Sequence, residues 1–182
     1  VERNEAGYRL NYDRPQSIGK LKAFYGNFGI LLRAYVYIRT LGRQGIGQVS
    51  RAAVLNANYI QAGLKDVFHL PYPGHCLHEC VFSDKTLHNV KTLDVAKALI
   101  DYGFHPPTIY FPLVVKGALM IEPTETESKE TLDQFISAMK EIAKKAESHP
   151  ELFHDAPYLP KVSRPDETRA ARQPVLRWKK SK

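Results

Sequence analysis

The sequence lacks the features that mark membrane and secreted proteins. Its uninterrupted apolar stretches, such as 113–115 and 117–121, fall far short of the ~20 residues of a membrane-spanning helix. Residues 1–5 contain neither the basic stretch nor the apolar core of a signal peptide. We therefore expect neither a transmembrane segment nor a signal peptide. A chain that begins at Val1 is also expected to be a fragment of a longer protein.

Cysteine is scarce, with 2 residues in 182, so the sequence offers no disulfide framework. Cys76 and Cys80 lie in a short apolar run that predicts a β-strand over 76–82. On one strand their Cα atoms would be ~13 Å apart, which is too far for a disulfide. Three histidines lie close by, yet no second Cys/His pair follows at a zinc spacing. The pattern favours a reduced, cytoplasmic-type protein with a buried thiol pair over a metal site.

Nucleotide-binding signatures are also missing, because the sequence has neither a glycine-rich loop ending in Lys-Ser/Thr nor a Gly-x-Gly-x-x-Gly string. The composition, with 43% hydrophobic and 25% charged residues, is typical of a soluble globular protein. Lys and Arg total 26 against 19 Asp and Glu, a net charge of +7 that suits an acidic partner. The basic residues are not gathered on one helix face, so the class of that partner stays open.

The hydrophobic periodicity predicts an α+β fold, in which helices cover one side of a small mixed or antiparallel sheet. After an extended entry segment with Ser17 as a candidate N-cap, the first helix is expected to break near Gly26 and Gly29 and to end at Gly42. Gly103 is expected to end the third helix. We expect helices at 18–41, 47–65, 92–102 and 128–147, a short helical turn within 166–172, and strands at 76–82, 108–111 and 118–121, the last two forming a hairpin.

Two polar strings at strand ends are candidate sites. In 103–108, two prolines would hold His105 and Thr108 at a fixed geometry, although His105 could equally be a satisfied loop residue. Glu122 follows a predicted strand, where its carboxylate could orient an imidazole or bind an ammonium group. Thr124 and Glu127 have the spacing of a capping box, so we expect Thr124 to cap the next helix.

Several strings of this sequence together resemble the glycine decarboxylase family, the P-protein of the glycine cleavage system, and specifically the second subunit of its two-subunit bacterial form. Each string alone is a weak signal, but their order and spacing are specific and extend over nearly the whole chain. They are Phe-Tyr-Gly-Asn-Phe-Gly at 24–29, Arg-Ala-Tyr at 33–35, Leu-Asn-Ala-Asn-Tyr at 55–59, His-Glu-Cys at 78–80, and the strings at 103–108, 121–125 and 169–178.

The resemblance implies an aminotransferase-like enzyme of fold type I that depends on pyridoxal phosphate. Such an enzyme decarboxylates glycine, with the pyridine ring as electron sink, and passes the aminomethyl group to the lipoyl arm of the carrier H-protein. The implied partners are therefore glycine, the H-protein and the first subunit of the enzyme.

One departure from the family pattern bears on the cofactor. The family holds pyridoxal phosphate through a Lys that follows a His, and this sequence contains no His-Lys pair. The simplest interpretation is that the chain is the C-terminal part of the subunit and is inactive alone. We expect 1–66 to be a helical segment from the end of the large domain, and 67–182 to be the small C-terminal α/β domain with an extended tail.

Polar groups at strand ends and glycine-rich bends predict the residues that line the substrate and cofactor cleft. Arg33 either pairs with the substrate carboxylate or forms a salt bridge between helices. The candidates are Asn27, Arg33, His78, His105, Thr108 and Glu122. The alternative hypothesis, from a different class, is a non-catalytic basic module that binds nucleic acid or an acidic protein.

Overall fold

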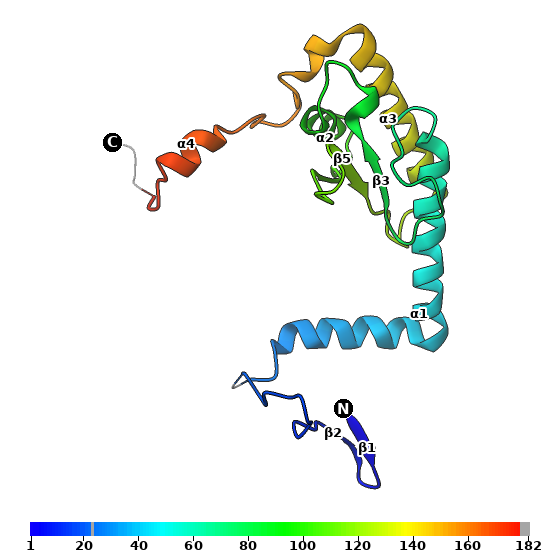
Figure 1. Ribbon diagram of the computed structural model, residues 1–182, viewed down its shortest axis with the longest axis vertical. Helices are drawn as coiled ribbons and strands as arrows, with labels where there is room; N and C mark the ends of the chain where they lie inside the picture. The colour runs from blue at the N-terminus through cyan, green and yellow to red at the C-terminus, as the bar shows by residue number, and fades with distance from the viewer. Residues whose placement is uncertain (23, 179–182) are drawn as a thin grey trace. The chain divides into compact units, whose positions relative to one another are not determined.

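The structure is a computed structural model that describes residues 1–22 and 24–178. The chain divides into two compact units, Val1–Ile46 and Gly47–Lys182, which are called the first and second unit below. The sheet and the hydrophobic core lie in the second unit (Figure 1). The expected domain boundary between residues 66 and 67 concerns the longer protein and stays a prediction. Among the described helices, none is both long enough and apolar enough to cross a membrane.

The first unit begins with an antiparallel hairpin of β1 (Glu2–Asn4) and β2 (Gly7–Arg9) and continues into helix α1 (Phe28–Leu64). The helix begins ten residues later than expected because Asn27 caps it, its Oδ1 accepting from the Gly29 amide at 2.9 Å. Ser17 instead accepts from the amide of Gly19, so its expected role as N-cap is wrong.

Gly42 interrupts α1 as predicted. Its φ of 64° and ψ of −176° lie outside the helical region, so the residues before and after it form two separate helices. A φ in this range favours glycine over residues with a Cβ. The second of these helices continues through Leu64 and belongs, from Gly47 onward, to the second unit.

The second unit contains a three-stranded antiparallel sheet in the order β3-β5-β4, which confirms the predicted α+β fold. The structure confirms the predicted helices at 92–102 and 128–147 and the hairpin at 108–121. Most of the observed ends lie within one or two residues of the predicted ones. The elements are β3 (Cys80–Ser83), η1 (Asp84–Thr86), α2 (Thr92–Asp101), β4 (Thr108–Ile109), β5 (Ala118–Ile121), α3 (Lys129–Ser148), η2 (Pro150–Phe153) and α4 (Glu167–Arg172).

The core lies on one face of the sheet. In the register of β3 and β5, Cys80 faces Ile121 and Phe82 faces Leu119, and all four side chains belong to the core. Helices α1, α2 and α3 supply most of the rest, and the segments around them add Phe68, Leu87, Val90 and Phe153. Every residue of the predicted apolar stripe of α3 is buried, namely Leu132, Phe135, Ile136, Met139, Ile142, Ala143 and Ala146.

Two local predictions in the second unit are wrong. The strand expected over 76–82 begins only at Cys80, because Cys76 lies in a loop whose backbone is bonded to a side chain of α1. The cap of α3 is Ser128, whose Oγ accepts from the Thr131 amide at 3.1 Å. Thr124 is therefore not the cap, and its hydroxyl lies 2.8 Å from that of Thr126 instead.

A network of hydrogen bonds joins the β4–β5 connection to the start of α2. The buried Thr92 hydroxyl lies 2.9 Å from Asp84 Oδ2 and 2.8 Å from the carbonyl oxygen of Gly117. The Thr92 amide donates to Asp84 Oδ2 at 3.0 Å. The Asp84 amide donates to the Gly117 carbonyl, also at 3.0 Å. Because a Cβ on Gly117 would lie 1.9 Å from Asp84 Oδ1, only glycine fits there.

We predict that Gly117→Ala lowers the free energy of unfolding by about 3 kcal/mol, from the steric clash with Asp84 and the strain of a φ of +67°. The measurement is urea unfolding of the 182-residue chain followed by circular dichroism. Gly74→Ala is the matched control, because its added Cβ meets nothing within 4 Å. Equal stability of the two variants would contradict a stabilising role of this hydrogen-bond network.

Candidate functional site

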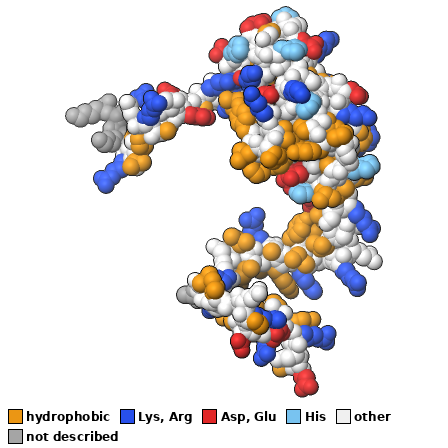
Figure 2. Space-filling view, viewed as in Figure 1, with side chains coloured by type: hydrophobic (Ala, Val, Ile, Leu, Met, Phe, Trp, Pro, Cys, Tyr) orange, Lys and Arg blue, Asp and Glu red, His pale blue; other side chains and the backbone are white. Residues whose placement is uncertain are grey.

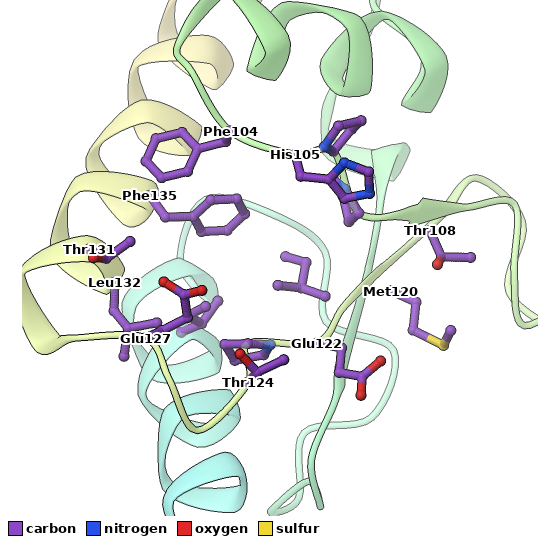
Figure 3. A pocket seen from close by; sticks show the side chains of 15 residues that line it. Phe104, His105, Thr108, Met120, Glu122, Thr124, Glu127, Thr131, Leu132 and Phe135 are labelled. Carbon is purple, nitrogen blue, oxygen red and sulfur yellow. The ribbon is translucent and has the colours of Figure 1, made fainter. Parts of the chain in front are cut away.

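The second unit has a cleft of about 410 Å³ where the chain passes from α2 to β4 and from β5 to α3 (Figure 3). Residues 104–108 and 120–124 form two of its sides. The turn before α3, the first turns of α3 and Ile60 of α1 complete the lining. Three of the predicted site residues, His105, Thr108 and Glu122, meet in this cleft.

His105 is positioned by the end of α2. Gly103, with a φ of 82°, ends the helix in a Schellman motif, in which the Phe104 amide donates to the Leu99 carbonyl at 3.0 Å. The Phe104 ring then packs edge-on against Phe135 of α3, with the ring centroids 5.3 Å apart. His105 follows directly and is exposed at the cleft, between this aromatic anchor and two prolines.

Thr108 and Glu122 are positioned by the sheet. Thr108 pairs with Met120 in the β4–β5 register, and Glu122 directly follows the last residue of β5. Successive side chains of a strand point to opposite faces, so Glu122 shares a face with Met120, while Ile121 faces the core. Figure 3 shows Thr108, Met120 and Glu122 pointing to the same side, away from Phe135.

The opposite side of the cleft holds residues that the sequence did not indicate as site residues. Glu127 and Thr131 line the cleft beside Phe135, and Figure 3 shows the Glu127 carboxylate pointing into it. The turn that carries Glu127 is tied to α1, because Asn56 Nδ2 donates to the Thr124 carbonyl at 2.9 Å. Such a contact spans 68 residues, so no local pattern predicts it.

His78 lies apart from this cleft, in a loop that borders a second cavity of about 320 Å³. Asn58 of α1 holds the loop, donating from Nδ2 to the Cys76 carbonyl at 2.8 Å and accepting from the Cys76 amide at 3.2 Å. Gln61 Nε2 donates to the Gly74 carbonyl at 2.8 Å. The structure therefore does not bring His78 together with His105, Thr108 and Glu122.

Asn27 and Arg33 lie in the first unit. Asn27 uses its side-chain oxygen to cap α1, and Arg33 is exposed on that helix. Their part in a cleft of the longer protein stays a prediction.

The cleft does not by itself fit pyridoxal phosphate. Among the described residues that line it, the ionisable side chains are His105, Glu122 and Glu127, with no Lys or Arg. The lining thus offers neither an amine for the cofactor's aldehyde nor a fixed cation for its phosphate. The described residues also contain no group of three or more His, Cys, Asp or Glu side chains placed to hold a metal ion.

The two cysteines are free thiols in different environments. Cys80 is buried in the core, and burial raises its pKa to about 12. Cys76 is half-buried in the loop before β3, and burial also raises its pKa above the ordinary value. They do not share a strand face, so the expected buried pair on one strand is replaced by one core thiol and one loop thiol.

The comparisons with known proteins agree on one family. A family model described as "Glycine dehydrogenase, C-terminal domain" matches residues 49–155. The probable glycine dehydrogenase (decarboxylating) subunit 2 of Oceanobacillus iheyensis is 61% identical over 181 residues, covering 98% of this chain and 37% of the relative. Its counterpart in Halalkalibacterium halodurans is 58% identical over 182 residues, covering 99% of this chain and 37% of that relative. The chain thus spans little more than a third of the length of these relatives.

A solved structure shows a similar fold. The crystal structure of glycine decarboxylase (P-protein) of the glycine cleavage system, in inhibitor-bound form, matches with a TM-score of 0.56 and 22% sequence identity. The match covers 66% of this chain and 28% of that one. None of these matches supports the alternative hypothesis of a module that binds nucleic acid or an acidic protein.

We predict that the native chain presents a single reactive thiol. Cys80 is buried in the core and its pKa is raised to about 12, so at pH 8 it stays protonated and does not react with Ellman's reagent, whereas the half-buried Cys76 reacts slowly. Both thiols react in 6 M guanidinium chloride. The Cys76→Ser variant, as the control, loses all native reactivity. Two thiols that react at equal rates in the folded chain would contradict the assigned environments.

Proposed function

The chain belongs to the family of the glycine dehydrogenase C-terminal domain, and from this premise we propose that it is the C-terminal part of glycine dehydrogenase (decarboxylating) subunit 2. The observation that carries the proposal is the 61% identity to such a subunit over 98% of the chain. The whole enzyme would decarboxylate glycine with pyridoxal phosphate and transfer the aminomethyl group to the lipoyl group of the H-protein. The first subunit would be its obligate partner.

In this proposal the chain supplies one wall of the active site and another part of the enzyme holds the cofactor. The absence of Lys and Arg from the described lining of the cleft supports this division. It also agrees with the missing His-Lys string in the sequence. The isolated chain is therefore expected to be inactive. A cytoplasmic location is proposed as well, on the basis of the two free thiols.

Within the wall, His105 is the residue proposed to hold or move a proton. An imidazole changes its charge near neutral pH and can donate or accept a proton at either ring nitrogen. The Phe104–Phe135 packing on one side and the two prolines on the other would restrict the movement of the backbone at His105. A fixed backbone position would help to place the ring for proton transfer to a bound substrate.

Glu122 and Thr108 are proposed to bind and orient the substrate from the sheet side of the cleft. The carboxylate of Glu122 can bind an ammonium group, and the Thr108 hydroxyl can donate or accept a hydrogen bond. The backbone of Thr108 is fixed by the β4–β5 register, and Glu122 directly follows the last residue of β5. Asn56, which holds the turn after Glu122, would act as a positioning residue for this part of the cleft.

The test is glycine–bicarbonate exchange by the full-length subunit reconstituted with the first subunit, pyridoxal phosphate and the H-protein. We predict that His105→Ala lowers the exchange rate by about 100-fold or more, as expected for loss of a proton-transfer group. The change is expected in kcat rather than in the KM for glycine.

His88→Ala is the matched control, because His88 is also exposed but lies outside the cleft lining. The 182-residue chain alone, assayed with pyridoxal phosphate, is expected to give no exchange. Exchange by the isolated chain would refute the division of roles. Equal effects of the two histidine substitutions would refute the role of His105.

A further inference from the structure

The first half of α1, residues 28–41, is apolar around most of its circumference. At 3.6 residues per turn, its apolar side chains span an arc of about 260°, from Tyr37 round to Val36, with Arg39 as the charged residue inside the arc. The remaining arc carries Gly29, Thr40 and Arg33. A helix on the surface of a globular protein has an apolar stripe only a little wider than 100°.

These apolar side chains are uncovered in the first unit. Phe28 is 73% exposed, Ile30 62% and Tyr35 60%, and every residue from 28 to 40 is exposed. Figure 2 shows hydrophobic side chains lying open along this helix. Exposed apolar surface of this extent marks a surface that another part of a protein covers.

The breadth of the arc limits what can cover it. A separate protein that docks on a helix covers one face and leaves the other in water. A helix that is apolar over about 260° needs neighbours on most sides, which is the situation of a helix inside a protein core. The charges add a second requirement, because α1 contains four Arg and no Asp or Glu. Arg33 and Arg39, which lie about 120° apart around the helix, then need carboxylates from the covering part.

The relatives show that enough chain exists to do this. The matched family is a C-terminal domain, so the remaining part of a relative precedes the matched region. That part makes up nearly two thirds of the length of the relatives. It would join the present chain ahead of the β1–β2 hairpin, with residues 1–27 between it and the exposed helix.

We propose that the preceding part of the same subunit encloses residues 28–41, so that the first half of α1 is an internal helix of the full-length protein. The enclosing part supplies acidic side chains to Arg33 and Arg39. This assigns Arg33 a structural ion pair rather than the substrate carboxylate. Because α1 continues into the second unit, the enclosed helix connects the preceding part to the helix that carries Asn56 and Asn58. The inference concerns assembly and does not depend on the reaction proposed above.

The test is hydroxyl-radical footprinting of the full-length subunit, read at Phe28 and Tyr35 by mass spectrometry. The expected result is oxidation at least tenfold slower in the folded full-length subunit than in the 182-residue chain, without the first subunit and independent of protein concentration. Equal oxidation rates would overturn the proposal. Protection that requires the first subunit, or that is lost on dilution, would also overturn it, by assigning the covering surface to another molecule.

A pair of substitutions provides an independent readout. Val36→Asp places a charge in the apolar arc, so it is expected to lower the melting temperature of the full-length subunit by about 10 °C or more. In the 182-residue chain, where Val36 is 54% exposed, the same change is expected to have no measurable effect. Thr40→Asp is the matched control, on the polar arc beside Arg33. Equal effects of the two substitutions in the full-length subunit would contradict an enclosed apolar arc.

Discussion

The close approach of α1 and α3 at Gly63 is the constraint on which the second unit depends. A Cβ on Gly63 would lie 2.7 Å from Cδ1 of Ile136, so the glycine leaves room for the Ile136 side chain to pack against α1. Ile60 and Leu64, on the same helix, are buried in the core. In Figure 1, the first turns of α3 lie beside the last turns of α1. With the helix fixed in this way, its polar side chains have fixed positions from which to hold the loops around it.

Three amide side chains of α1 hold these loops, and one phenol of α1 bonds to α3. Asn58 and Gln61 hold the loop before β3, and Asn56 holds the turn after β5. Tyr59 donates to Asp133 on the second turn of α3 at 2.5 Å. Hydrogen bonds from Lys129 and then Tyr59 lower the pKa of Asp133, so this contact is stable at neutral pH and weakens only as acid protonates the carboxylate. One helix thus organises both the cleft and the neighbouring loop, while the sheet sets the register of Thr108 and places Glu122 at the end of β5.

The parts of the fold that could be predicted from the sequence are those set by local patterns. The apolar stripe of α3 and the glycine that ends α2 can be recognised from a few neighbouring residues. The hairpin can be predicted from the turn residues between its two strands. The segment 76–79 has the composition of a strand but forms a loop, in which the backbone groups of Cys76 bond to an Asn side chain that lies 18 residues away in sequence. Likewise, strand-end positions indicated His105, Thr108 and Glu122, whereas Glu127 was assigned only to a capping box. Recognising it as a cleft residue needs the fold of the turn that Asn56 holds.

The central claim is that side-chain amides of α1, rather than the sheet, hold both the turn after β5, at the cleft, and the loop before β3, beside it. Backbone hydrogen exchange at Cys76 tests it most directly, because the Cys76 amide donates to Asn58 Oδ1. In Asn58→Ala the account predicts that exchange at Cys76 becomes at least tenfold faster, while the amide of Ile142, in the core of α3, keeps its rate. Unchanged exchange at Cys76, or an equal loss of protection at Ile142, would contradict it.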